Sequence, residues 1–262
     1  MTLPAKPDRW AALAAMTPAR IALGRAGSSL PTREVLAFAL DHARARDAVH
    51  IPFDAAFVAA QIAALGFETL EVASAAPDRA SYLRRPDLGR RLAPESQTLL
   101  DRQPRTAPDV VVVVADGLSS PAVHAHAAPL LAELQPLMAA QGWRLGPVAL
   151  AHQGRVALGD EIGERIGARL ALLLVGERPG LSAPDSLGAY LTYAPRVGRR
   201  DAERNCISNI RPAGLGYRDA AFRIAWHVRE SLARGYSGIA LKDESATAGA
   251  RRISDSPGTL PK

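Results

Sequence analysis

The sequence predicts an α/β fold, with a Rossmann-like, mostly parallel sheet flanked by helices and preceded by a helical N-terminal region. Residues 109–117, DVVVVVADG, form a continuous β-branched run, which is typical of a strand buried on both faces in a parallel sheet. After this run, strand-like and helix-like segments alternate as far as residue 176, in the rhythm of a βαβαβ unit. The hydrophobic fraction of 48% over 262 residues is large enough for a sizeable core.

The N-terminal region, residues 1–103, is predicted to be mostly helical, and no strong strand pattern occurs before Val110. The apolar run at 10–16 is short and suits a surface helix. A longer helix is expected from Thr32, which is a plausible N-cap, and another over 54–66, where a glycine stops it. These helices would precede the sheet-forming part of the chain.

The region 104–243 is predicted to form the α/β domain. After the first strand, Ser120 is expected to cap a helix with Pro121 at its first position, where a missing N–H costs nothing. This helix should continue past Ala132, with its two internal prolines as points of disturbance. The later elements are a strand near Val148, a helix over 156–170, a strand ending at Gly176, a helix over 217–235 and a last short strand over 238–243. The tail, 244–262, is polar and is expected to be frayed or disordered.

The stretch 176–217 departs from an ordinary core because it is rich in prolines, glycines and polar residues. Disorder is not expected, since apolar, strand-prone residues occur at 187–194 and 205–210. Long irregular loops in compact domains are usually either functional or disordered. We therefore interpret this stretch as an ordered binding loop.

Composition and charge restrict the classes of function. The net charge is +6, but the cations are almost all arginine and are spread along the chain, and aromatic residues make up only 5%. No nucleic acid is therefore expected as a partner, and an acidic protein partner or plain solubility is favoured. The single cysteine, Cys206, excludes an intrachain disulfide and a multi-cysteine metal site, which indicates a reducing compartment. Because the N-terminal apolar run is too short for a bilayer, we expect a soluble cytoplasmic protein with no membrane contact.

Candidate ligand-binding residues follow two of the predicted strands. In open α/β sheets, ligands bind outside the carboxyl ends of the strands. Asp116 and Gly117 follow the first strand of the α/β domain, and Glu177, Arg178 and Pro179 follow the third. The alternative is that Glu177 and Arg178 only pair with neighbouring charges at the rim, and position alone does not decide between the two.

Several other chemistries are disfavoured. Cys206 has no adjacent histidine, and a lone cysteine is more often a small buried hydrophobe than a nucleophile. His124 and His126 are two residues apart on a predicted helix, so they cannot form the usual i, i+4 metal pair and are expected at the surface or at an interface. Neither the phosphate-loop pattern nor GxGxxG occurs, which disfavours a nucleoside triphosphatase or a standard nicotinamide enzyme.

Four segments together carry a family resemblance. They read RIALGRAGSSLPT at 20–32, VVVVADGLSS at 111–120, GERPGLSAPDSLGAY at 176–190 and NCISNIRPAGLGY at 205–217. In this order, and over a span from Asp8 to Asp243, the chain resembles the small subunit of ethanolamine ammonia-lyase, an adenosylcobalamin enzyme. A shared run as long as NCISNIRP is far more specific than a loose glycine pattern.

The resemblance implies a division of labour between two chains. The large subunit would form a (β/α)₈ barrel that holds the substrate, and the small subunit would cover the cobalamin from the other side, within a higher hetero-oligomer. The family's cofactor contacts, carried onto matching positions, fall on Val156, Glu177 and Cys206. Valine would supply apolar contact, glutamate would accept hydrogen bonds from corrin amides, and a neutral cysteine would pack softly. None of the three would be a catalytic group or a metal ligand.

The implied reaction converts ethanolamine to acetaldehyde and ammonia through an adenosyl radical, with the cofactor carrying the chemistry. The aspartate-x-histidine-x-x-glycine pattern that supplies a cobalt ligand in many cobalamin proteins is absent. This agrees with the family's mode, in which dimethylbenzimidazole stays on cobalt.

The resemblance leaves two locations open, the cytoplasm and a bacterial microcompartment. Some family members carry a longer N-terminal extension associated with packaging, whereas only a few residues precede DRWAAL at 8–13 here. Two other functions also remain open: a non-catalytic α/β binding or scaffold module, and a generic nucleotide-binding enzyme.

Overall fold

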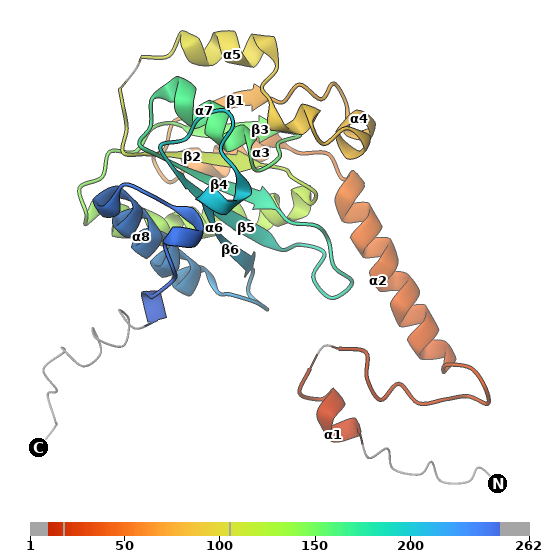
Figure 1. Ribbon diagram of the computed structural model, residues 1–262. Helices are drawn as coiled ribbons and strands as arrows, with labels where there is room; N and C mark the ends of the chain where they lie inside the picture. Colours follow the sequence, from red (N-terminus) through yellow and green to blue (C-terminus); the bar gives the residue numbers. More distant parts are fainter. Residues whose placement is uncertain (1–9, 18, 105, 247–262) are drawn as a thin grey trace, which may run out of the picture.

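Six strands form one continuous sheet in the computed structural model, which describes residues 10–17, 19–104 and 106–246 (Figure 1). The strands are β1 (Thr69–Ala73), β2 (Val110–Ala115), β3 (Val148–His152), β4 (Leu170–Gly176), β5 (Leu187–Tyr193) and β6 (Arg204–Ile210). Their order across the sheet is β1-β3-β2-β4-β5-β6. The first four in this order run parallel, whereas β5 pairs antiparallel with both β4 and β6. The predicted α/β class with a mostly parallel sheet is confirmed.

Helices pack on both faces of the parallel part of the sheet. One layer consists of α3 (Ala55–Ala63), α6 (Ser120–Ala139) and α8 (Tyr217–Arg234). The opposite layer contains α5 (Pro94–Asp101) and α7 (Leu158–Ile166). Successive side chains of β2 point to opposite faces, so that its even-numbered valines enter the first layer's core and its odd-numbered valines the second. The prediction of a strand buried on both faces is therefore confirmed.

Capping side chains set the starts of two predicted helices. Asp54 accepts a hydrogen bond from the backbone N–H of Phe57 and so caps α3, as the sequence predicts. α6 is capped by Ser119, one residue before the predicted Ser120, and it runs to Ala139 through its two prolines as one helix. The predicted cap at Thr32 is also displaced by one residue, because Pro31 occupies that position without a side-chain bond. Such shifts of one residue are ordinary at helix ends.

Two strand predictions are wrong. The region before Val110 does contain a strand, β1, which lies at the sheet edge beside β3 and buries only Val72 of its five residues. The expected strand over 238–243 is instead a 3₁₀ turn, η3 (Gly238–Ala240). Gly238 has a φ of +87°, and the Asn205 side chain both accepts from the Gly238 N–H at 2.8 Å and donates to its carbonyl oxygen at 3.1 Å. These bonds hold the segment against β6 in a shape that a strand does not have.

The predicted binding loop, 176–217, contains more regular structure than we expected. β5 and β6 lie within it, together with a 3₁₀ turn, η2 (Asp201–Glu203). The stretch is ordered, as predicted, but it forms the antiparallel edge of the sheet as well as the connections around it. The irregular connections are therefore short, and the strands fix where they begin and end.

The N-terminal helices form an arm beside the sheet. α1 (Ala11–Ala14) is followed by α2 (Thr32–His50), which projects away from the body of the molecule (Figure 1). Ala48 is the one buried residue of α2. The short surface helix predicted over 10–16 is confirmed in its central part. Most of the predicted tail, 244–262, lies outside the described residues. Within the described part of the chain, no helix is long and apolar enough to cross a membrane.

Candidate functional site

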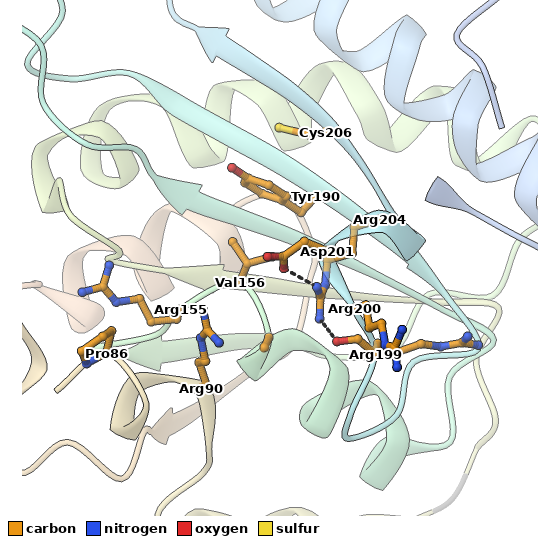
Figure 2. Close-up of a pocket in the computed structure, with 11 residues that line it drawn as sticks. Pro86, Arg90, Arg155, Val156, Tyr190, Arg199, Arg200, Asp201, Arg204 and Cys206 are labelled. Carbon is orange, nitrogen blue, oxygen red and sulfur yellow. Dashed lines mark hydrogen bonds and ion pairs between the residues drawn. The ribbon is translucent and has the colours of Figure 1, made fainter. Parts of the chain in front are cut away.

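A groove runs along the carboxyl ends of β2, β3 and β4 and over one face of β5 and β6. It consists of two adjoining cavities of about 460 and 620 Å³, which share Arg155, Val156 and Tyr190 as lining residues. We call the smaller cavity the inner half; its other lining residues include Tyr82, Gly117, Glu177 and Arg178. We call the larger cavity the outer half; its other lining residues include Arg90, Arg199, Arg200, Arg204 and Cys206 (Figure 2).

The outer half is open because the two sides of the antiparallel edge are covered differently. On one side, Leu191 and Ile207 are buried in the core beneath α6 and α8. On the other side, Tyr190 of β5 lies directly across from Cys206 of β6, and both side chains line the cavity. Since neighbouring residues of a strand point to opposite faces, the same strands supply both a core surface and a binding surface.

Glu177 is held in the inner half by one of its two carboxylate oxygens. Its Oε2 accepts a hydrogen bond from the Ser186 hydroxyl and another, at 3.1 Å, from the backbone N–H of Asn209. The carboxylate lies against Gly188 of β5, where an added Cβ would be 3.0 Å from Oε1. Among the described residues, none donates a hydrogen bond to Oε1, so this oxygen remains available to accept one from a ligand.

The loop that carries Val156 is fixed by buried polar contacts. The Asp116 carboxylate accepts a hydrogen bond from the Gly154 N–H at 3.1 Å and pairs with Arg79 at 3.0 Å. The Tyr82 hydroxyl donates to the Gly154 carbonyl oxygen at 3.1 Å, and the Arg155 guanidinium stacks on the Tyr82 ring at 4.3 Å. Burial raises the pKa of Asp116 to about 6, and the Arg79 charge opposes that rise. Asp116 therefore lies beneath the groove and supports it.

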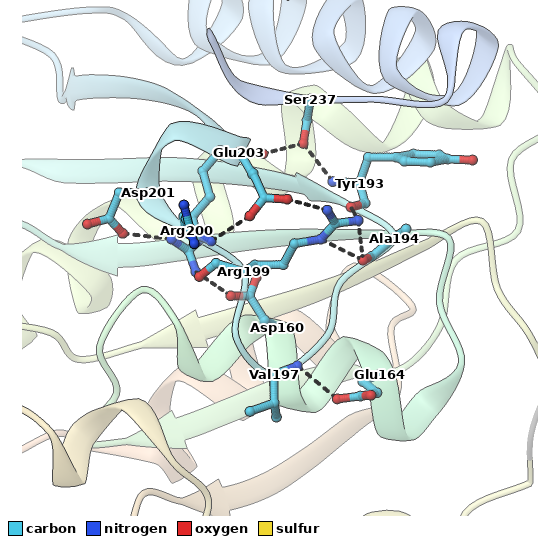
Figure 3. A network of polar contacts seen from close by, with 11 residues as sticks. Asp160, Glu164, Tyr193, Ala194, Val197, Arg199, Arg200, Asp201, Glu203 and Ser237 are labelled. Atoms are coloured by element: carbon cyan, nitrogen blue, oxygen red, sulfur yellow. Dashed lines mark hydrogen bonds and ion pairs between the residues drawn. The ribbon is translucent and has the colours of Figure 1, made fainter. Parts of the chain in front are cut away.

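A network of ion pairs fixes the outer rim (Figure 3). Arg204 forms a buried pair with Asp160 of α7 and a second pair with Asp201 at 2.6 Å. Arg199 pairs with Glu203 and donates to the carbonyl oxygen of Tyr193 at 3.0 Å. Burial raises the pKa of Asp160, and the adjacent Arg204 guanidinium opposes that rise. Through Arg204, the network joins η2 and β6 to α7, so these three elements of the rim hold one another in position.

The thiol of Cys206 and the hydroxyl of Tyr190 are the side chains of the outer half that could act as nucleophiles, and both are neutral. Cys206 is exposed and not buried as we expected, yet the partial loss of solvent beside Tyr190 raises the pKa of its thiol. Burial likewise raises the pKa of Tyr190. Both groups therefore stay protonated near neutral pH. Across the described residues, no group of three or more histidine, cysteine or acidic side chains is arranged to hold a metal.

The two histidines of α6 lie outside the groove. His126 is buried, and its Nδ1 lies 2.8 Å from the Tyr217 hydroxyl, so the expectation of a surface or interface position is wrong for this residue. His124 is half-buried, and its Nε2 accepts a hydrogen bond from the Asp54 N–H at 2.9 Å. Both side chains connect helices of the α6 layer, and they do not form a metal pair.

The three residues implied by the family resemblance come together in this groove. Val156 lines both halves, Glu177 lines the inner half and Cys206 lines the outer half. Among the other residues predicted to follow strands, Gly117 and Arg178 line the inner half, whereas Pro179 lines neither.

Sequence reasoning missed Tyr82, Arg155 and Tyr190. Alternation along 187–193 could have indicated Tyr190, because its neighbours are the apolar core residues of that strand. Arg155 and Tyr82 carry no such signal, since they lie in a loop and in the short helix α4 (Arg79–Arg84), which are distant in the sequence.

Comparison with known proteins supplies the family. The family model described as ethanolamine ammonia-lyase light chain matches residues 7–242. The chain belongs to the ethanolamine ammonia-lyase small-subunit family. It is 59% identical to the ethanolamine ammonia-lyase small subunit of Ralstonia nicotianae over 237 residues, which cover 89% of this chain and 88% of that protein. It is 57% identical to the small subunit of Bradyrhizobium diazoefficiens, over 93% of this chain and 94% of that protein.

A third small subunit, from Azotobacter vinelandii, is 53% identical over 98% of this chain and 96% of its own length. The match therefore includes both halves of the groove and the N-terminal arm. As a member of the ethanolamine ammonia-lyase small-subunit family, the chain is a subunit of a lyase, and its family name implies a larger partner chain.

Proposed function

We propose that this chain covers adenosylcobalamin in the groove while a large subunit holds ethanolamine, and that the two chains together release acetaldehyde and ammonia. The observation that carries the proposal is the convergence of Val156, Glu177 and Cys206, from three separate segments, on one continuous groove. The resemblance to the family implied these residues individually. Their common location gives the proposal a physical basis.

The lining of the groove fits the periphery of a corrin. A corrin ring has an apolar rim that carries primary amides, and these amides are hydrogen-bond donors. Val156 and the Tyr190 ring offer apolar contact along both halves, and Glu177 Oε1 offers an acceptor. The buried Nε of Arg155 has no partner in the described structure, and it is a donor that a ligand carbonyl could satisfy.

The chain's own part in the reaction is to bind and to exclude water. When bound, adenosylcobalamin supplies a carbon-centred radical through cleavage of its cobalt–carbon bond. Cys206 and Tyr190 stay protonated, so neither is poised as a base or a nucleophile. The substrate-binding and proton-handling groups are accordingly assigned to the large subunit.

Reconstitution tests this proposal. The chain is purified alone and together with the large subunit, and ammonia release from ethanolamine is measured with added adenosylcobalamin. The pair should turn over and the lone chain should not. Ammonia release by the lone chain would overturn the division of labour. A well-folded pair that binds the cofactor but releases no ammonia would favour the non-catalytic binding module.

A further inference from the structure

The outer half of the groove is strongly basic. Five arginines line it, Arg90, Arg155, Arg199, Arg200 and Arg204, against one acid, Asp201. Asp201 already pairs with Arg204 at 2.6 Å. The cavity therefore carries an excess of positive charge that its own lining residues do not neutralise.

The five arginines divide into two groups by their partners. Arg199 and Arg204 belong to the ion-pair network that holds the rim together. The ion pairs at this cavity are made by Arg199 and Arg204, and among the described residues Arg90 and Arg200 form none. The Arg155 guanidinium has only the Tyr82 ring and a 3.4 Å bond to the Tyr82 carbonyl oxygen. This leaves three guanidinium groups at the cavity without a carboxylate.

Arg90 and Arg155 belong to the same wall of the cavity (Figure 2). The Arg155 backbone N–H donates to the Gly89 carbonyl oxygen at 2.7 Å, and a Cβ added to Gly89 would lie 2.8 Å from Arg155 Cγ. The absence of a side chain at Gly89 thus lets Arg155 pack closely beside the residue that precedes Arg90. A pair of planar, permanently charged guanidinium groups is suited to bind phosphate oxygens.

We infer that Arg90 and Arg155 form an anion subsite for the phosphodiester of the cofactor's nucleotide tail, an inference that rests on the proposed function. The corrin amides are neutral, so the phosphodiester is the anionic group of the cofactor's periphery. When the cofactor is bound, Arg90 and Arg155 would hold this phosphodiester at the outer half of the groove. The acceptor Glu177 in the inner half and the basic outer half together orient the cofactor along the groove.

The subsite predicts a phosphate-dependent difference in affinity. Adenosylcobinamide phosphate and adenosylcobinamide differ by the phosphate, and their dissociation constants can be measured by equilibrium dialysis and corrin absorbance on the complex of both subunits. The wild-type complex should bind the phosphate form about tenfold to a hundredfold more tightly, the range of one charged hydrogen-bonded pair. Arg90→Gln and Arg155→Gln should each reduce that ratio severalfold, whereas Arg218→Gln, a change of an exposed arginine on α8, should leave it unchanged.

The outcomes separate this inference from the proposed function. If both corrinoids bind but the ratio is one, or if the ratio survives in both groove variants, the anion subsite is wrong and the cofactor site stands. If neither corrinoid binds, the proposed function fails and the inference with it. Arg90 is exposed and unpaired among the described residues, so Arg90→Gln should fold normally even if Arg155→Gln does not. Inorganic phosphate that binds alone in the same concentration range would show a free-anion site and overturn the assignment to the cofactor.

Discussion

The parallel part of the sheet and its antiparallel edge differ in what covers their second face. Every residue of β2 and β4 is buried between the two helix layers, whereas β6 buries three of its seven residues. Both parts share the core beneath α6 and α8. The outer half of the groove lies over Tyr190 and Cys206 of this edge. The same sheet thus holds the fold together on one side and leaves a shaped surface for a ligand on the other.

The largest expected effect is the loss of stability caused by a substitution in the parallel part of the sheet, which both helix layers cover. Leu172 of β4 is fully buried in the core beneath α6, so Leu172→Ala should lower the free energy of unfolding by about 2–5 kcal/mol. Urea denaturation of the purified chain measures this change. Cys206→Ala, on the open face, is the matched control and should change the same quantity by less than about 0.5 kcal/mol. Equal losses in the two variants would contradict the difference between the faces.

A pH-dependent effect should also come from the covered side, at Asp116. Burial raises its pKa from 3.8 to about 6 in the folded chain, so between these values the folded state binds more protons than the unfolded state. The stability due to this group should therefore be greatest near pH 4, fall as the pH rises to about 6, and then stay level. Relative to Asp116→Asn, the wild type should lose about 1–3 kcal/mol over that interval. Parallel stability curves for the two proteins would show that Asp116 titrates normally.

On the open side, the expected effect is on ligand binding and not on stability. Glu177→Gln keeps the shape of the side chain but removes the charge beside Gly188, so cofactor affinity should fall by about 1–3 kcal/mol in the reconstituted complex. Glu133→Gln, a change of an exposed glutamate on α6, is the control and should leave affinity unchanged. A Glu177→Gln complex with normal affinity would remove Glu177 from the cofactor site.

The smallest expected change concerns the thiol. Cys206 is exposed and protonated, and it lies across from Tyr190, so Cys206→Ser should preserve the shape and neutrality of the outer half. Cofactor affinity should stay within about threefold of the wild type, since no hydrogen bond to a charged group is lost. A much larger loss of affinity would indicate a specific contact made by sulfur.

The sequence predicts what local patterns determine. The continuous valine run identified β2, and the residues after β4 placed Glu177 at the carboxyl end of a strand. Contacts between segments that are distant in the sequence leave weaker patterns in it. β1 was missed because it is a short edge strand with one buried residue, and the position of Cys206 opposite Tyr190 depends on the register of β5 and β6. The contact of Arg155 with Tyr82 joins a loop to the short helix α4, and no local pattern in the sequence indicates it. The family resemblance, and not the pattern, indicated that Val156, Glu177 and Cys206 belong to one site.

The central claim is that this chain binds the cofactor without taking part in the chemistry. Cys206→Ala in the reconstituted complex tests it most directly, with turnover measured at saturating adenosylcobalamin alongside cofactor affinity. A binding contact changes the concentration that is needed, whereas a catalytic group changes the rate even when the site is full. We predict substantial turnover at saturation. A loss of rate by several powers of ten, with cofactor affinity and subunit assembly unchanged, would contradict the claim and give the thiol a chemical role.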